Sequence, residues 1–494
     1  MRAALILPVC LGLGPALIPG EDRGPASGTE RQALRHVDAG RFDLALATLE
    51  AFLDSAPSDL GDAVRRRLEK LQARSLFELG DYPGCERTLR RLLSTRAVPA
   101  ADVLECRAQL AKALSFQELH DEAIRTIEDV VGDPRAAALR PVAVALCLRG
   151  RQYARARPHV EAILAMDGGH RFARFARGIV LSRSGRYREA IPELGWGLEL
   201  PGARRDASFE LALVLGKLGR PREALAHLRD ILEADPFDEE ACYQASRQHV
   251  LLGGPAAARM GALLTRTFET LKAVTGPSSR EHHLRAAGDA AGASLLRARR
   301  FERLGRHEEA IAALESAIRS GRGRLAVHLA VRDNWTRMEL HGEARRVLRE
   351  AAALGVPQGQ LQGLAERQRA VERQLERRRT EATGPLGRAR WRLARATWKD
   401  AAPHLEDLRR LAETRGATSL ADRAARLLLA HEPRSASALG YLARRTRDPS
   451  LVALRGHYLA RLAALQPGEP RWKRELAAVR AAFLGEEPPS PPER

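Results

Sequence analysis

The most regularly spaced residues that could do chemistry are cationic. Arg149, Arg183 and Lys217 are 34 residues apart, and the same interval separates Arg303 from Arg337. Guanidinium and ammonium groups form charge-assisted hydrogen bonds with carboxylates. If one structural unit repeats every 34 residues, these side chains stack in register and offer a row of donors to an acidic partner. Leu251 interrupts the row where its next member would stand.

The same row of cations could also arise without a binding role, in two ways. A cation in the last turn of a helix interacts favourably with the helix dipole, whatever its function. The chain is also basic throughout, with 81 Lys and Arg against 62 Asp and Glu, a formal charge of +19 and a pI of about 10.7. Net charge informs on partners and solubility more than on fold.

No residues form a recognisable catalytic or metal-binding constellation. The five cysteines contain no CxxC pair, and no Cys/His cluster has zinc spacing. The sequence has no phosphate-binding glycine loop, no HExxH and no GxSxG. We therefore predict no enzyme activity, no cofactor and no metal site. The glycosylation sequon at Asn334 falls within a predicted helix, so we expect it to be unused.

A short phrase recurs along the chain: glycine, an aromatic residue two positions later, and alanine three positions after that. Clear copies run from Gly40 to Ala45 and from Gly185 to Ala190. The other copies end at Cys85, Ala123, Ala156, Ala224, Ala258, Ala310 and Ala344. The alanines from 156 to 258 are each 34 residues apart, and so are the last two.

A pair of packed helices accounts for this phrase physically. An aromatic fraction of only 4% favours a core of closely packed helices over a sheet. The glycine suits a turn with positive φ, and the alanine must be small where the partner helix approaches. His120, His307 and His341 stand at the aromatic position, which predicts packed turn residues. One pair cannot bury its own apolar face, so the pairs must stack.

This phrase and period resemble the tetratricopeptide repeat family. The resemblance covers residues 31–355 and implies an all-α fold: a right-handed α-solenoid of about nine helix-turn-helix repeats. It also implies a scaffold that binds partners in the concave groove lined by the first helix of each pair. The cationic row would then face this groove. Aromatic residues on successive first helices would either contact the partner or pack between repeats: Phe172, Phe175, Phe209 and Tyr243.

One family mode of binding is not expected here. Members that bind chaperone tails use a clamp of lysine and asparagine on neighbouring first helices. The only asparagine in this chain is Asn334, and the equivalent positions hold residues such as Lys112 and Ala145. The resemblance therefore implies a protein or peptide partner without identifying it.

The regions outside the regular array have distinct compositions. Residues 1–20 are apolar after Arg2 and fit an export signal or an apolar leader. An extended helix near 262–274 and a loop at 276–279 are predicted to lengthen one repeat. Residues 356–384 read as a charged bridging helix or, alternatively, as a coiled-coil dimer contact. Residues 385–484 read as degenerate repeats with a terminal cap, and 485–494 as a disordered tail.

The leading prediction is a non-catalytic protein-binding scaffold. It would act in an envelope or secretory assembly, in the periplasm or outside the cell, if the leader is an export signal, and in the cytoplasm otherwise. Two alternatives stay open. The basic region 356–494, with a net charge of +11, could bind nucleic acid, or the chain could be an accessory subunit of an enzyme complex. The sequence does not predict an oligomeric state.

Overall fold

The computed structural model describes residues 28–55, 61–94, 98–132, 134–275, 279–321, 324–353, 358–446, 451–484 and 486. The chain divides into two compact units. Unit 1 comprises Met1–Ile231, Glu240–Gly261 and His282–Asp289, and unit 2 comprises Leu232–Glu239, Ala262–Glu281 and Ala290–Arg494. The boundaries between the units fall around the lengthened repeat.

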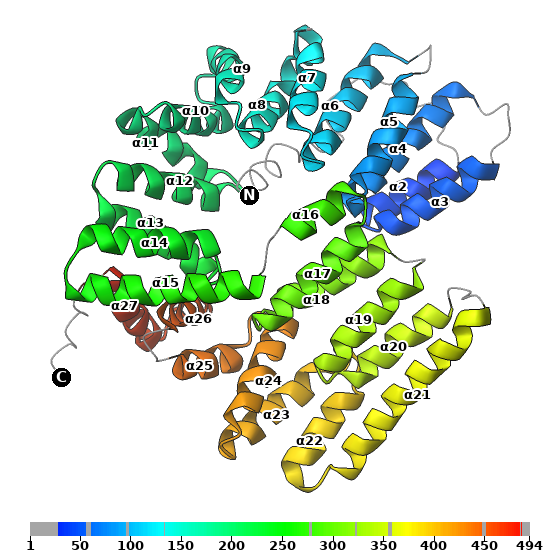
Figure 1. The fold of residues 1–494 in the computed structure, drawn as a ribbon, viewed down its shortest axis with the longest axis vertical. Coiled ribbons are helices and arrows are strands. Elements are labelled where there is room, and N and C mark those ends of the chain that lie inside the picture. Colours follow the sequence, from blue (N-terminus) through cyan, green and yellow to red (C-terminus); the bar gives the residue numbers. More distant parts are fainter. Residues whose placement is uncertain are drawn as a thin grey trace. The chain divides into compact units, whose positions relative to one another are not determined.

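Unit 1 is built from paired helices joined by short turns (Figure 1). Its helices are α2 (Gly28–Asp38), α3 (Phe42–Ser55), α4 (Asp62–Leu79), α5 (Tyr82–Leu93), α6 (Ala100–Phe116), α7 (His120–Val131), η1 (Pro134–Leu139), α8 (Arg140–Arg149), α9 (Tyr153–Met166), α10 (Arg171–Arg183), α11 (Tyr187–Gly195), η2 (Trp196–Glu199), α12 (Arg204–Lys217) and α14 (Glu239–Leu252). A boundary between the units also falls after Glu239, the first residue of α14, and within three further helices: α13 (Pro221–Ala234), α15 (Pro255–Thr275) and α16 (Ser279–Ala286).

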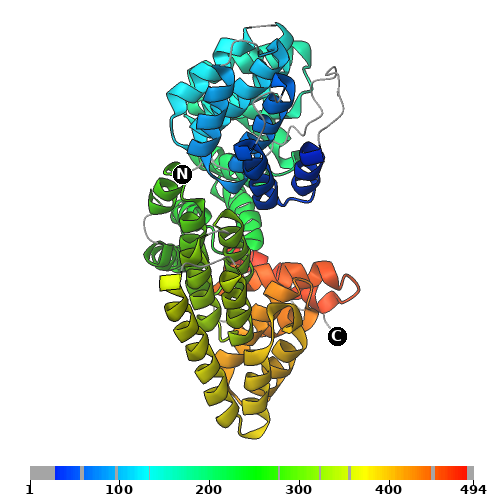
Figure 2. The same cartoon turned by 90° about the vertical axis from the view of Figure 1, so that its right-hand side faces the viewer.

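Unit 2 continues the same architecture, and Figure 2 shows its paired helices from a second side. Its helices are α17 (Ala290–Arg303), α18 (His307–Ser320), α19 (Leu325–Arg337), α20 (His341–Ala352), α21 (Gln358–Thr380), α22 (Gly384–Arg395), η3 (Trp398–Asp400), α23 (Ala402–Thr414), α24 (Thr418–His431), α25 (Ala436–Arg445), α26 (Val452–Leu465) and α27 (Pro470–Leu484). The predicted all-helical fold of stacked helix pairs is confirmed.

The turn between the two helices of a repeat has one fixed backbone geometry. Its glycine has a positive φ in the clear copies, for example +67° at Gly40 and +78° at Gly185. The same position keeps this geometry where the sequence has no glycine: φ is 66° at Glu118, 57° at Arg151 and 61° at Glu339. The tertiary fold therefore imposes a left-handed residue that costs non-glycine side chains about 1–2 kcal/mol.

The small residue of the phrase is buried, as predicted, in every copy but one. Ala45, Cys85, Ala123, Ala156, Ala190, Ala224, Ala310 and Ala344 are all 0% exposed. The exception corrects our sequence register. Ala258 is exposed, whereas Ala257 is 3% exposed. Four residues after Ala257, Gly261 approaches the Cβ of His249 on α14. The copy in α15 is therefore shifted by one residue.

The predicted bridging segment is α21, whose apolar side packs within the chain. Val371 is 1% exposed and belongs to a core cluster with Leu348 and Ala351 of α20, and Leu375 packs against this cluster. The seam on which the coiled-coil alternative rested is thus occupied from Val371 to Leu375 by the protein's own α20. This packing does not favour α21 as a dimer contact.

The C-terminal region contains a repeat that the sequence analysis missed. Gly416 has φ +69° and precedes Ala421, which is 0% exposed, by the five residues found in the other copies. This phrase was overlooked because Thr418 replaces the aromatic residue. Within residues 385–484, which we read as degenerate repeats, Trp398–Asp400 forms η3 and is followed by the fully buried Ala401 and Leu405.

Some predictions fall outside the described residues. These are the leader at 1–20, the loop at 276–278 and the tail, of which only residue 486 is described. The extended helix before that loop is observed as α15, which has 21 residues. Within the described part of the chain, no helix is long and apolar enough to cross a membrane.

Candidate partner-binding surface

The five cationic residues of the predicted row occupy equivalent places in the structure. Arg149, Arg183 and Lys217 are the last residues of α8, α10 and α12 in unit 1. Arg303 and Arg337 are the last residues of α17 and α19 in unit 2. The predicted register is therefore observed within each unit. Their surroundings differ, however, and most of these side chains already contact other groups of the protein.

Arg149 is used for packing between repeats. Its guanidinium lies 4.3 Å from the centre of the Phe116 ring at the end of α6, a cation–π contact. Burial is the main cause that lowers the pKa of Arg149. One terminal nitrogen, Nη1, is buried and has no hydrogen-bond partner among the described residues. Arg149 therefore closes the gap between two first helices and offers little to a partner.

Arg183 is held by an ion pair to the next first helix. Its Nη2 donates to the Glu210 carboxylate of α12 at 2.5 Å, and its Nε donates to the Tyr153 hydroxyl at 3.4 Å. Burial alone would lower the pKa of Arg183, but Glu210 and Tyr153 outweigh it and raise the pKa. Since Glu210 is only 9% exposed, this pair ties α10 to α12.

Lys217 is exposed at the end of α12. The preceding residue, Gly216, faces the Gln248 side chain of α14 so closely that a Cβ would clash with it. An ion pair of 3.3 Å between Arg205 and Glu240 joins the other ends of the same two helices. The end of α12, which Lys217 terminates, therefore lies against α14.

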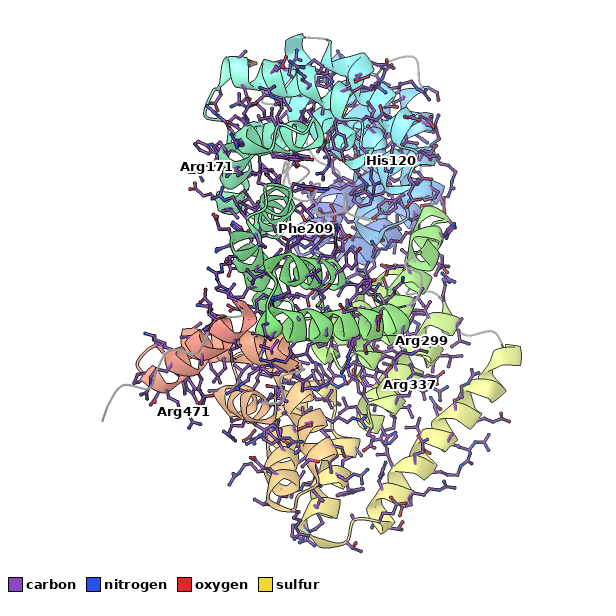
Figure 3. All side chains as sticks on the ribbon, turned by 60° about the vertical axis from the view of Figure 1, so that its left-hand side comes forward. His120, Arg171, Phe209, Arg299, Arg337 and Arg471 are labelled. Carbon is purple, nitrogen blue, oxygen red and sulfur yellow. The ribbon has the colours of Figure 1, made fainter. Side chains whose placement is uncertain are left out.

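The two members of the row in unit 2 also differ from each other. Arg337 pairs with Glu302 of α17 at 3.1 Å and donates to the Asn334 side chain at 2.5 Å. Arg303 is exposed, next to Glu302 in the sequence. Figure 3 marks Arg337 on α19. The row is therefore a set of helix ends with different surroundings. Lys217 and Arg303 are its two exposed members that form no ion pair among the described residues.

The structure corrects our prediction for the aromatic residues. Phe172, Phe175 and Phe209 are 5%, 0% and 2% exposed and belong to the core. A Cβ on Gly197 would meet the Phe175 ring, which shows how tightly this ring is enclosed. Phe209 lies on α12 (Figure 3), with the guanidinium of Arg205 over its ring at 4.8 Å. These rings fill the space between repeats and cannot contact a partner.

Tyr243 is different, because it opens an exposed apolar face on α14. Tyr243, Val250 and Leu251 are 41%, 75% and 61% exposed. Arg247 lies between them on the same face, with its guanidinium 5.9 Å from the Tyr243 ring centre. The spacing 243, 247, 250 and 251 is that of one helix face, and the rest of α14 is largely buried. We call these four residues the α14 face.

Three residues of the α14 face were not predicted from the sequence. Leu251 was treated as a gap in the cationic row, and Arg247 and Val250 were given no role. A signal was present, because Leu251 stands at the position held by Arg149, Arg183 and Lys217 in the preceding repeats. A position that carries a cation in three successive repeats is predicted to face solvent, as Lys217 does. An aliphatic residue there predicts an exposed apolar side chain.

The predicted turn histidines are packed, as expected. His307 and His341 are 9% and 3% exposed, and His120 is partly buried. Burial is the main cause that lowers the pKa of each ring, to about 4 for His307. Asn334 is 0% exposed and donates to the Ala330 carbonyl at 2.8 Å.

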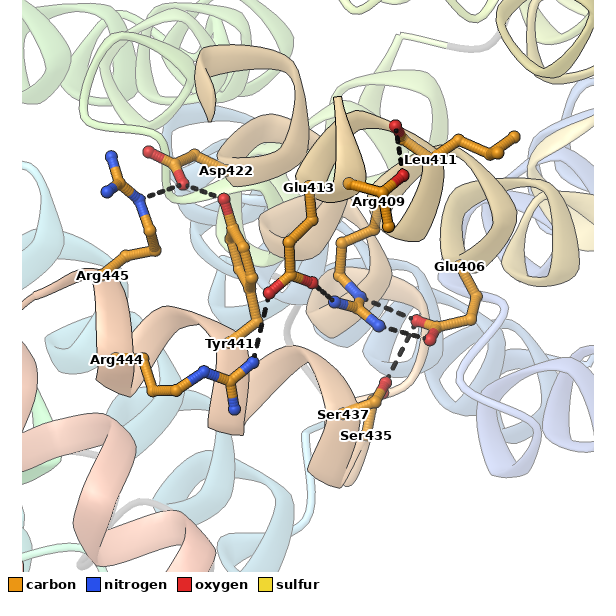
Figure 4. A network of polar contacts seen from close by, with 11 residues as sticks. Glu406, Arg409, Leu411, Glu413, Asp422, Ser435, Ser437, Tyr441, Arg444 and Arg445 are labelled. Atoms are coloured by element: carbon orange, nitrogen blue, oxygen red, sulfur yellow. Dashed lines mark hydrogen bonds and ion pairs between the residues drawn. The ribbon is translucent and has the colours of Figure 1, made fainter. Parts of the chain in front are cut away.

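The basic C-terminal region is rich in internal ion pairs. Figure 4 shows Arg409 of α23 between Glu406 and Glu413, at 2.6 and 2.8 Å, with Arg444 of α25 at 3.3 Å from Glu413. Three further arginines surround Glu339: Arg378, Arg390 and Arg423, at 3.2, 3.3 and 3.6 Å. Several arginines of this region are thus paired with carboxylates of the same unit. Within the described residues, no group of His, Cys, Asp or Glu is arranged to hold a metal ion.

Comparison with known proteins identifies the repeat. A model of the tetratricopeptide repeat family matches residues 146–195 and 175–239, the region of regular 34-residue spacing. Two solved structures are similar at 15% identity. One is the APC/C hetero-tetramer Cut9-Hcn1, covering 91% of this chain and 96% of that chain with a TM-score of 0.26. The other is the P58(IPK) TPR domain, for which the similarity covers 70% of this chain and 98% of that chain with a TM-score of 0.21. No curated protein matches the sequence.

Proposed function

Since the chain is a tetratricopeptide repeat protein, we propose that it is a non-catalytic scaffold that binds a segment of a partner protein on the α14 face. Proteins of this class generally act as interaction scaffolds. The observation that carries the proposal is the exposure of Tyr243, Val250 and Leu251 on a first helix whose other residues are largely buried. Exposed apolar groups gathered on one face are typical of interaction sites.

The charges around the α14 face favour a partner segment that is both apolar and acidic. Arg247 lies within the face, and Lys217 stands at the end of the neighbouring helix. Aliphatic or aromatic side chains of the segment would cover Val250, Leu251 and the Tyr243 ring. Its carboxylates would meet Arg247 and Lys217 through charge-assisted hydrogen bonds. A tyrosine and an arginine side by side are also common among residues that dominate binding energy.

The test compares capture of partners by the wild-type protein and by the double variant Val250→Glu/Leu251→Glu. Both side chains are exposed, so the fold should tolerate the change, while two carboxylates in the contact would repel an acidic segment. The partner is first identified by quantitative capture from an extract of the source cells. Its affinity is then measured with purified proteins, and we expect the double variant to bind at least about tenfold more weakly.

A matched control is available in the same unit. Met166, at the end of α9, is 76% exposed but lies outside the α14 face. Met166→Glu should leave the affinity unchanged, and Lys217→Glu should weaken binding and reduce its salt dependence. Equal binding by the wild-type protein and the double variant would refute the α14 face as the binding site.

The two alternative functions gain no specific support. Nucleic-acid binding by residues 356–494 would need accessible cations, and the arginines around Glu339, Glu406 and Glu413 are paired with carboxylates. A role as an accessory subunit of an enzyme complex would use the same binding surface. It therefore stays a prediction that identification of the partner will test.

We further propose that the scaffold acts in an envelope or secretory assembly. The support is the apolar leader at residues 1–20 of the sequence. The mass of the N-terminal peptide of the protein isolated from its own cells tests this. A mature chain that begins after the leader supports export, and an intact leader in a soluble extract contradicts it.

A further inference from the structure

A pocket of about 420 Å³ lies within unit 2, apart from the α14 face. Its wall is formed by residues 233–237, the turn and first residues of α18, one side of α24 and one side of α26. A volume of this size is typical of sites that bind small molecules. Leu429, Leu454 and Phe237 give the pocket an apolar side, and the remaining wall is strongly charged.

Several charges of the pocket neutralise one another. Arg306 lies between Asp235 and Glu309, at 3.2 and 2.6 Å. Glu233 accepts two hydrogen bonds from Arg480, at 2.7 and 2.6 Å. These contacts account for three of the four carboxylates in the wall. Burial is the main cause that raises the pKa of the fourth, Glu308, and the nearby Arg461 opposes this shift.

Two guanidinium groups remain without a carboxylate. Arg461 donates to the Pro433 carbonyl at 2.6 Å and lies 3.3 Å from Nε2 of His457. Arg426 lies directly over Gly305, where a Cβ would clash with its guanidinium, and its Nε is buried without a hydrogen-bond partner. Neither residue has a carboxylate within ion-pair distance in the part of the chain that the structure describes. Arg426 and Arg461 are therefore the two guanidinium groups of the wall that are open to an anionic ligand.

The amino end of α18 adds further donors to the same wall. The first amides of a helix have no acceptor within the helix, and the side chain of Arg306, the residue before α18, does not cap them. His307 opens this 14-residue helix, is 9% exposed, and has its Nδ1 buried without a hydrogen-bond partner. Burial, with Arg423 and Arg426 nearby, lowers the pKa of His307 to about 4, so its ring is neutral at pH 7. A helix start of this kind favours bound anions.

We propose that this pocket binds a small phosphomonoester, with Arg426, Arg461 and the amino end of α18 holding its phosphate group. The planar donor forks of two arginines suit phosphate oxygens. The uncapped amides and the ring of His307 provide donors for a third oxygen. The organic part of the ligand would lie against Leu429, Leu454 and Phe237. The site gives this protein a ligand-binding function in addition to its scaffold role.

Isothermal titration calorimetry of the full chain with glycerol 1-phosphate tests the proposal, with inorganic phosphate and sulfate as further probes at constant ionic strength. We expect glycerol 1-phosphate to bind with a Kd of about 1 mM or tighter. The variants Arg426→Gln and Arg461→Gln should each weaken binding at least about tenfold. Arg410→Gln is the matched control, because Arg410 is exposed on α23 and does not line the pocket.

A second measurement on the wild-type protein keeps the test valid if a variant fails to fold. Phenylglyoxal modifies accessible arginines, and bound phosphate should protect Arg426 and Arg461 but not Arg410 in peptide maps. Absence of binding up to about 10 mM glycerol 1-phosphate, or protection that is equal at all three arginines, would overturn the proposal. Tighter binding of sulfate than of glycerol 1-phosphate would also overturn it, because the ligand would then be any oxyanion.

Discussion

The left-handed turn inside each repeat predicts that a Gly→Ala change lowers stability in the turn and raises it in a neighbouring helix. Gly185, in the turn between α10 and α11, has φ +78°. Gly195, the last residue of α11, has φ −55° and ψ −34°, which is ordinary helical geometry. At both positions an added Cβ would meet no atom within 4 Å. Gly→Ala therefore changes backbone energetics at each position without adding a steric clash.

The magnitudes follow from two opposing terms. A left-handed non-glycine residue costs about 1–2 kcal/mol, while replacing glycine reduces the entropy of the unfolded chain and stabilises the fold by about 0.4–1 kcal/mol. Gly185→Ala incurs both terms and should destabilise the protein by about 1 kcal/mol. Gly195→Ala gains the second term alone and should stabilise it by about 0.5 kcal/mol. Arg151→Gly, at φ 57°, reverses both terms: it removes the left-handed strain but raises the entropy of the unfolded chain, and should stabilise the protein by about 0.5–1 kcal/mol.

The assay is urea unfolding followed by circular dichroism. Amide hydrogen exchange of α8 to α11 should accompany it, because repeat arrays can unfold in parts. The three variants lie in neighbouring repeats of unit 1, so their effects can be compared in one region. The reasoning is refuted if both Gly→Ala changes have the same sign, or if Arg151→Gly destabilises the exchange-protected helices α8 and α9.

Three further predictions concern the core and the buried charges. Ala190→Leu, at a position that is 0% exposed, should destabilise the fold by about 1–3 kcal/mol. Ala258→Leu, at an exposed position, should change stability by less than about 0.5 kcal/mol. Equal urea midpoints for the two variants would contradict the register shift in α15. Burial alone would raise the pKa of Glu339, but Arg423, Arg378 and Arg390 outweigh it and lower the pKa. Its stabilising charge is therefore fully present above the ordinary carboxyl pKa and is lost as the pH falls through the lowered value. Glu339→Gln should lower the free energy of unfolding by about 1–2 kcal/mol at pH 7. The difference in stability between this variant and the wild-type protein should shrink in acid, and a difference that stays constant would contradict the prediction. Burial is the main cause that raises the pKa of Cys106 and Cys147 to about 12. These thiols should therefore react with iodoacetamide only after urea has unfolded the protein. Rapid labelling of Cys106 or Cys147 in the native protein would refute this prediction.

The repeat could be predicted from the sequence because its signal is local and is multiplied by repetition. Most copies carry a glycine for a left-handed turn, and all carry a small residue for a close helix contact. The copies without that glycine, such as the one at Arg151, keep a positive φ because the packed helix pair imposes it. The α15 copy was misplaced by one residue because both Ala257 and Ala258 satisfy the local pattern. Their difference in exposure depends on how Gly261 packs on His249 of the neighbouring helix.

The candidate sites could be predicted only in part. The repeat period located each cation at a helix end, but it could not show that Arg183 pairs with Glu210 or that Arg149 covers Phe116. Phe175 and Phe209 have the spacing of groove residues, and the structure places them in the core. The pocket of unit 2 was outside the reach of sequence reasoning altogether, since its wall residues come from distant parts of the chain and share no pattern.

The sequence by itself therefore determined the repeating helix pair, its turn geometry and the register of the cationic helix ends, because these depend on residues that are close along the chain. Tertiary structure decided which cations are neutralised, which aromatic rings are enclosed and where the chain divides into two units. It also decided that α14 keeps Tyr243, Val250 and Leu251 exposed. The physical reason is that burial and ion pairing depend on which helices become neighbours, and a side chain's own spacing contains no information about the groups that will face it.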